Sequence, residues 1–164
     1  MSAWKVPAFR LYFTSFFVSN IGTWMHNFAQ TWLMYRLTHG DPMYLGYLGF
    51  AFAIPMTFLA PFGGSLADRV PRAKVLYGTQ GLSAVVACTL ALLVHSGRAE
   101  PGHLVLSQFV LSSLLAIDNP ARQSVIADLV PRSELPSALA QNSAIFTGAA
   151  FVGPMIGGAL LGHI

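Results

Sequence analysis

Five long stretches of this sequence contain no Asp, Glu, Lys or Arg, and short charged segments separate them. A helix rises about 1.5 Å per residue, so roughly 20 apolar residues cross the hydrocarbon core of a bilayer, which is about 30 Å thick. The fourth stretch, 101–117, reaches nearly this length when it is extended to residue 119. We therefore expect five membrane-spanning helices, at about 11–35, 43–67, 75–97, 102–119 and 135–162.

Composition excludes an ordinary soluble domain. Hydrophobic residues make up 54% of the 164 residues and charged residues only 9%, with a mean hydropathy of +0.58. Soluble domains carry roughly 25% charged residues. The net charge of +3 is no nucleic-acid footprint, because the basic residues are scattered in pairs and do not line one face with aromatic residues. The sequence predicts an all-α integral membrane protein whose first partner is the lipid bilayer, with no nucleic-acid partner.

The basic residues also predict an orientation. If the N-terminus is cytoplasmic, seven of the nine fall on the cytoplasmic side, and only Arg36 and Arg98 lie outside. The seven are Lys5, Arg10, Arg69, Arg72, Lys74, Arg122 and Arg132. By the positive-inside rule, we expect a multi-pass protein of the cell (inner) membrane with a cytoplasmic N-terminus, and with segment 63–74 in the cytoplasm.

Polar side chains recur on one face of the first expected span. Spacings of three, four and three residues place them in one stripe: Asn20, Thr23, Asn27 and Gln30. Inside a bilayer such a stripe must face protein or water. It either forms hydrogen bonds between helices or lines a substrate cavity, and Gln141 and Asn142 of the fifth span are further candidates for that cavity. His26 beside the stripe is either another hydrogen-bonding group or a proton carrier.

The charged segment between the second and third spans carries a recognisable pattern. It reads Gly64-Ser-Leu-Ala-Asp68-Arg69-Val-Pro-Arg72-Ala-Lys74. This resembles the loop 2–3 signature of the major facilitator superfamily, with Pro71 in place of the second Gly. The resemblance implies that Asp68 holds two six-helix halves together in the outward-open state. It also implies that Arg72 binds an acidic residue at the inner end of the fourth helix, either Asp118 or Asp128.

A second resemblance lies in the last third of the chain. Segments 118–123, 130–136 and 142–146 are similar to the superfamily branch that contains the enterobactin exporter and macrolide efflux proteins. Small residues then recur four apart in the fifth span, in a motif that includes Gly148, Gly153, Pro154, Gly157 and Gly158. Such rows allow close helix packing. By resemblance they are the exporter signature of the fifth helix, a hinge and an interface with a helix of the other half.

Together these features predict the first five helices of a six-helix bundle, the N-terminal half of a twelve-helix transporter. The expected function is secondary active efflux of small amphipathic molecules by alternating access. We also expect the chain to be a fragment, so that the C-terminal half of the same protein is its missing partner.

Two alternatives remain: a non-transporting remnant or packing subunit, and an intramembrane enzyme. The enzyme is disfavoured because the five His residues lack metal-ligand spacing and no Gly-x-Ser-x-Gly occurs. We expect no catalytic residues, no metal site and no cofactor.

Overall fold

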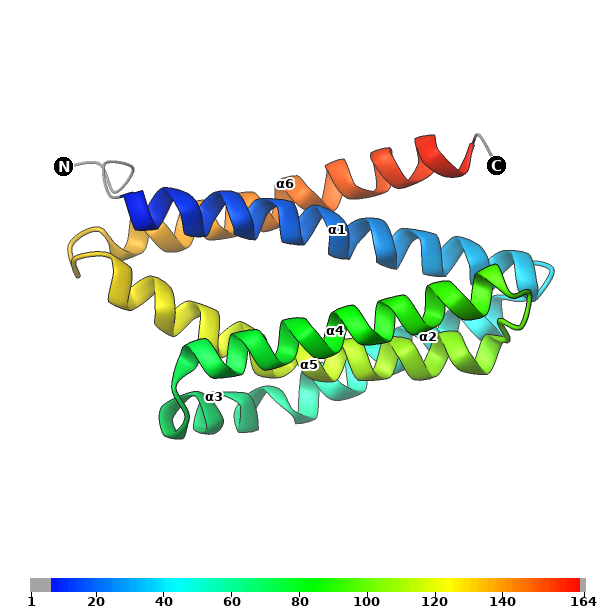
Figure 1. Cartoon of the computed structure of the whole chain (residues 1–164), viewed down its shortest axis with the longest axis horizontal. Coiled ribbons are helices and arrows are strands. Elements are labelled where there is room, and N and C mark those ends of the chain that lie inside the picture. Colours follow the sequence, from blue (N-terminus) through cyan, green and yellow to red (C-terminus); the bar gives the residue numbers. More distant parts are fainter. Residues whose placement is uncertain (1–6, 163–164) are drawn as a thin grey trace. The chain divides into compact units, whose positions relative to one another are not determined.

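The structure is a computed structural model that describes the backbone of residues 7–162 and the side chains of residues 11–162 other than 66–69 and 129. This part of the chain is entirely helical, which confirms the predicted fold class (Figure 1). Its helices are α1 (Pro7–Leu37), α2 (Pro42–Phe58), α3 (Ala60–Arg69), α4 (Arg72–His95), α5 (Pro101–Leu129) and α6 (Leu135–Leu161).

Three of the described helices are long and apolar enough to cross a membrane. They are α4, α5 as far as Asp128, and α6. Helix α2 is also apolar but has only 17 residues. Helix α1 has 31 residues, and its polar side chains lower its hydropathy below that of the other three. Membrane crossing by α1 and by the α2–α3 pair therefore stays a prediction from the sequence.

Two helices differ from the expected spans, and each difference lies at a proline. The second span, expected as one helix over 43–67, breaks at Leu59 into α2 and α3. Pro61 follows the break, and it has no N–H to donate to the preceding turn. The fourth span, expected to end at residue 119, continues through Pro120 to Leu129. One proline removes only one helical hydrogen bond, and the flanking turns keep this helix intact.

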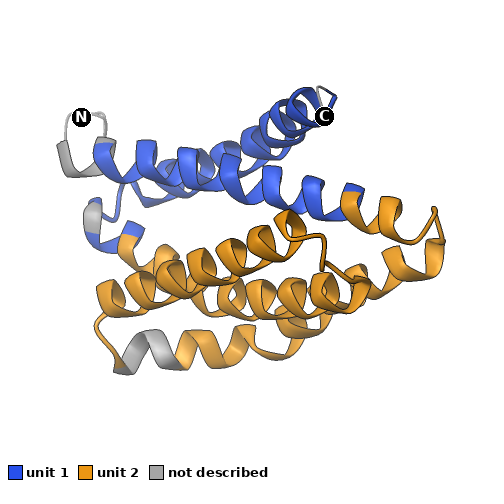
Figure 2. Ribbon diagram, turned by 45° about the vertical axis from the view of Figure 1, so that its right-hand side comes forward, with its two compact units in different colours: residues 1–32, 126–164 blue, residues 33–125 orange. Residues whose placement is uncertain are grey.

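The helices form two compact units, shown in blue and orange in Figure 2. The first contains Met1–Trp32 and Ile126–Ile164, and the second contains 33–125. Because α1 and α5 pass from one unit to the other, each unit is described by itself below.

Helices α1 and α6 form most of the first unit and run in the same direction. Its core consists of Phe13, Ile126, Val130 and Ala138, packed against Tyr12, Leu135 and Ile145. Further along both helices, the rings of Trp24 and Phe146 meet edge to face with centroids 5.5 Å apart. Because the contacting residues increase in residue number along both helices, α1 and α6 are parallel.

Helices α2, α3, α4 and the main part of α5 form the second unit, with the end of α1. One core cluster contains Met34, Leu48, Leu90 and Leu104, and a second pairs Val75 with Ala121. Leu90 and Val75 lie toward opposite ends of α4, while their partners on α5 follow in the reverse order. Helices α4 and α5 are therefore antiparallel, so the start of α4 meets the later turns of α5.

Candidate functional site at the junction of helices α3, α4 and α5

A buried carboxylate, Asp118 of α5, forms the centre of the site. It is 3% exposed, and both of its oxygens accept hydrogen bonds. Thr79 of α4 donates to Oδ1 over 2.6 Å, and Arg122 of α5 donates through Nε to Oδ2. A buried charge is tolerated when it is paired and hydrogen-bonded, because desolvation otherwise favours the neutral form. These two partners meet that requirement.

The continuation of α5 through Pro120 makes this ion pair possible. Asp118 and Arg122 are four residues apart, which places them on the same face of one helix. A helix that ended at residue 119 would leave Arg122 outside this register. The separation of four was visible in the sequence, whereas the unbroken helix that makes use of it was not expected.

Close to Asp118, helix α3 touches the backbone of α5 at Gly63. A Cβ atom on Gly63 would lie 2.7 Å from the carbonyl oxygen of Ala116 and 2.8 Å from the Cα of Ile117. Because Pro120 has no N–H, the Ala116 carbonyl lacks its usual helical donor four residues later. A residue without a Cβ lets the α3 backbone approach this carbonyl closely.

The neighbouring glycine of the predicted switch motif, Gly64, makes no such contact. A Cβ on Gly64 would have open space within 4 Å. Successive helix residues are rotated by about 100°, so the residue before Gly64 lies on a different face. It is Gly63 that turns toward α5.

The remaining residues of the predicted switch motif lie around the start of α4. Arg72 donates through Nη1 to the carbonyl of Ser124 on α5 over 3.4 Å, and Lys74 is exposed. The side chains of Asp68 and Arg69 fall outside the described residues. Of the two acidic partners expected for Arg72, Asp118 binds Thr79 and Arg122 instead, and Asp128 stays a prediction.

The polar stripe of α1 forms hydrogen bonds along its own helix. Asn20 donates to the carbonyl of Phe16 over 2.8 Å, and Thr23 donates to that of Ser19 over 3.0 Å. Asn27 is half-buried, whereas Gln30 is 3% exposed and its side chain interacts with that of His26. The described hydrogen bonds of Asn20 and Thr23 thus stay within α1, and a cavity lined by the stripe remains a prediction.

Of the two cavity candidates on α6, Gln141 lies at a groove. It lines an apolar groove of about 360 Å³ between α1 and α6, together with residues that include Phe13, Thr14 and Ile145. Its Nε2 donates to the hydroxyl of Ser137 over 3.3 Å. Asn142 is half-buried, and its Oδ1 has no hydrogen-bond partner in the described part of the chain.

The glycine motif of α6 packs against α1. A Cβ on Gly153 would lie 2.5 Å from the Cβ of Trp24, and one on Gly157 would lie 3.2 Å from the ring of Phe28. A Cβ on Gly158 would lie 3.7 Å from the same ring, whereas a Cβ on Gly148 would meet nothing within 4 Å. Pro154 lies inside α6. Close packing therefore accounts for Gly153 and Gly157, and a role at an interface with another half stays a prediction.

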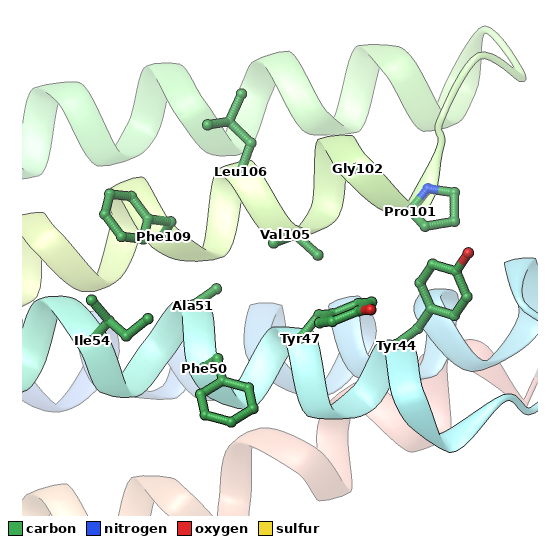
Figure 3. A pocket seen from close by; sticks show the side chains of 10 residues that line it. All are labelled: Tyr44, Tyr47, Phe50, Ala51, Ile54, Pro101, Gly102, Val105, Leu106 and Phe109. Atoms are coloured by element: carbon green, nitrogen blue, oxygen red, sulfur yellow. The ribbon is translucent and has the colours of Figure 1, made fainter.

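A second groove, which sequence reasoning missed, runs between α2 and α5. Figure 3 shows its lining, in which aromatic side chains of α2 lie opposite apolar side chains of α5. It has a volume of about 510 Å³, and its lining includes Tyr44, Tyr47, Phe50, Leu106 and Phe109. The signal was present in the sequence as three aromatic residues spaced three apart, at 44, 47 and 50.

Comparison with known proteins places the chain in a family. A family model described as transmembrane secretion effector matches residues 1–164. The chain belongs to this family of the major facilitator superfamily. The family is one of transporters and not of enzymes.

Two curated relatives are transporters. The staphyloferrin A transporter of Staphylococcus aureus (strain NCTC 8325 / PS 47) is 27% identical over 153 residues, which cover 93% of this chain and 38% of the relative. The uncharacterized MFS-type transporter YfiS of Bacillus subtilis (strain 168) is 30% identical over 146 residues, which cover 88% of this chain and 33% of the relative. This chain thus spans between a third and two fifths of the relatives' length. No solved structure matches the chain significantly.

Proposed function

We propose that this chain supplies the first membrane helices of a secondary active transporter that exports small amphipathic molecules by alternating access. The observation that carries the proposal is the pair formed by buried Asp118 and half-buried Arg122 inside α5, a helix apolar enough to cross a membrane. Ionisable residues inside membrane helices are costly and usually serve transport or proton transfer. The description of the family as a secretion effector supports the outward direction.

The groove between α2 and α5 supports the substrate class. Its volume of about 510 Å³ falls within the range of roughly 300–1,000 Å³ that accommodates drug-sized ligands. Its lining is apolar except for the hydroxyl groups of Tyr44 and Tyr47, which suits a molecule with an apolar body and a polar end. The relative named for staphyloferrin A makes that compound a second candidate substrate.

We assign the conformational switch to the cytoplasmic end of the helices, with the N-terminus in the cytoplasm. The positive-inside distribution of the basic residues supports this orientation. In the proposed switch, Gly63 lets α3 pack closely on α5, and Asp118, paired with Arg122 on its own helix, links α5 to α4 through Thr79. Asp68 and Arg72 act as the superfamily resemblance implies. Replacing Asp68 by Asn should then reduce transport while membrane insertion stays normal, and a normal flux in this variant would contradict the assignment.

Transport assays on the full-length gene product test the proposal. Inverted membrane vesicles would be energised in the presence of a fluorescent amphipathic dye or of labelled staphyloferrin A, and uptake would be compared with Asp118→Asn vesicles of equal protein content. We expect uptake of the dye by the wild type and a large reduction in the variant. Uptake of staphyloferrin A without uptake of the dye would show that the proposed substrate class is wrong and that this compound is the substrate. No flux of either compound, with the protein present in the membrane, would favour the non-transporting alternative.

A further inference from the structure

Thr79 makes the one hydrogen bond from another helix to Asp118 in the described part of the chain. The two side chains are 7% and 3% exposed. The other partner of Asp118, Arg122, belongs to the same helix and moves with it. Beside the bond from Arg72 to the Ser124 carbonyl, the Thr79–Asp118 bond is therefore a buried link between two side chains that any relative movement of α4 and α5 must break or keep.

The Thr79 hydroxyl has a second acceptor within reach. Its Oγ lies 2.6 Å from Oδ1 of Asp118 and 3.1 Å from the carbonyl oxygen of Leu76 on its own helix. A threonine hydroxyl carries one hydrogen, so the two acceptors compete for it. The charged carboxylate is the stronger acceptor. If α4 and α5 separate, the hydrogen can turn to Leu76, as helical threonines commonly do, and no buried donor is left without a partner.

We propose that Thr79 is a positioning residue of the transport switch, whose hydroxyl exchanges between Asp118 and the Leu76 carbonyl as the transporter changes conformation. The inference rests on the proposed function. Without Thr79, Arg122 would hold one carboxylate oxygen of Asp118, and the carboxylate could rotate about its bond to the side chain. Thr79 holds the other oxygen, so the carboxylate has one orientation while α4 and α5 are together. The bond sets the rate of the conformational change and leaves substrate affinity unaltered.

The test compares Thr79→Val, which replaces the hydroxyl by a methyl group of similar size, with Thr79→Ser, which keeps the hydroxyl. Thr89→Val is the matched control, since Thr89 is an exposed threonine of α4 whose hydroxyl, in the described part of the chain, donates to the Val85 carbonyl of its own helix over 2.8 Å. We expect Thr79→Val to lower the maximal transport rate several-fold with an unchanged KM. Thr79→Ser should restore most of the rate, and Thr89→Val should behave as the wild type.

A double variant separates positioning from simple packing. In an Asp118→Ala background the Thr79 hydroxyl has lost this acceptor, so adding Thr79→Val should cause no further fall in the remaining rate. Equal rates for Thr79→Val and Thr89→Val, or failure of Thr79→Ser to restore transport, would overturn the proposal. If Thr79→Val does not accumulate in the membrane, Thr79→Cys is measured instead, and a wild-type rate would count against the role. Failure of both variants to accumulate would make Thr79 a folding residue and also overturn it. Absence of wild-type flux, by contrast, would refute the proposed function itself.

Discussion

Replacing Gly63 by Ala should weaken the contact between α3 and α5. The added Cβ would lie 2.7 Å from the Ala116 carbonyl oxygen, whereas ordinary contact begins at 3.4 Å, so the helices must separate by about 3.4 − 2.7 = 0.7 Å at this point. The atoms it meets belong to the backbone of α5, and they cannot rotate away as a side chain could. Overpacking of this kind costs about 1–3 kcal/mol of unfolding free energy.

Gly64→Ala is the matched control for this prediction. Gly64 is the next residue of the same helix, but an added Cβ would meet nothing within 4 Å. In a helix, Ala is favoured over Gly by up to about 1 kcal/mol, so Gly64→Ala should be neutral or stabilising. The two variants of the full-length protein should differ by about 1–4 kcal/mol, measured as thermal or denaturant unfolding in detergent. If Gly63→Ala is as stable as Gly64→Ala, the close approach of α3 to the Ala116 carbonyl is wrong.

Two further predictions follow from the same contacts. Gly153→Ala should lower the unfolding temperature relative to Gly148→Ala, because its Cβ would lie 2.5 Å from the Cβ of Trp24 whereas Gly148 has open space; equal unfolding temperatures would contradict the packing of α6 on α1. Asp118→Asn and Arg122→Gln should each lower the free energy of unfolding. The loss should reach about 3–5 kcal/mol for Arg122→Gln, because this variant leaves a buried carboxylate without its cation. The double variant should recover part of this loss in a denaturation series, and strictly additive losses would argue against the pair.

The sequence was sufficient to predict the class of the protein. The chain has five uncharged stretches, and its few charged residues cannot cover the surface of a soluble protein. In lipid, the backbone of an apolar segment must form its hydrogen bonds within the protein. That requirement favours helices whatever their neighbours are. The motif between residues 64 and 74 and the small residues of 148–158 then predicted the superfamily, which the match over residues 1–164 confirms.

Local sequence was less reliable at the prolines. Pro61 follows a break between two helices, whereas Pro120 lies inside α5 without ending it. Both residues remove one hydrogen bond, so their own chemistry does not distinguish them. What differs is the surroundings, because the turns of α5 on both sides of Pro120 pack on α4 through Ile117 and Ala121.

Only the tertiary structure decided which polar and small residues form the candidate site. From the sequence, Thr79 was one threonine in an apolar span and Gly63 was one of two adjacent glycines. The antiparallel packing of α4 and α5 brings Thr79 to Asp118, 39 residues away in the chain, and the rotation of α3 turns Gly63 toward Ala116. Periodicity within a helix determines which residues share a face, but the neighbour that this face meets depends on how separate helices pack. The sequence alone therefore determined the helical class and the family, and the contacts between helices determined the site.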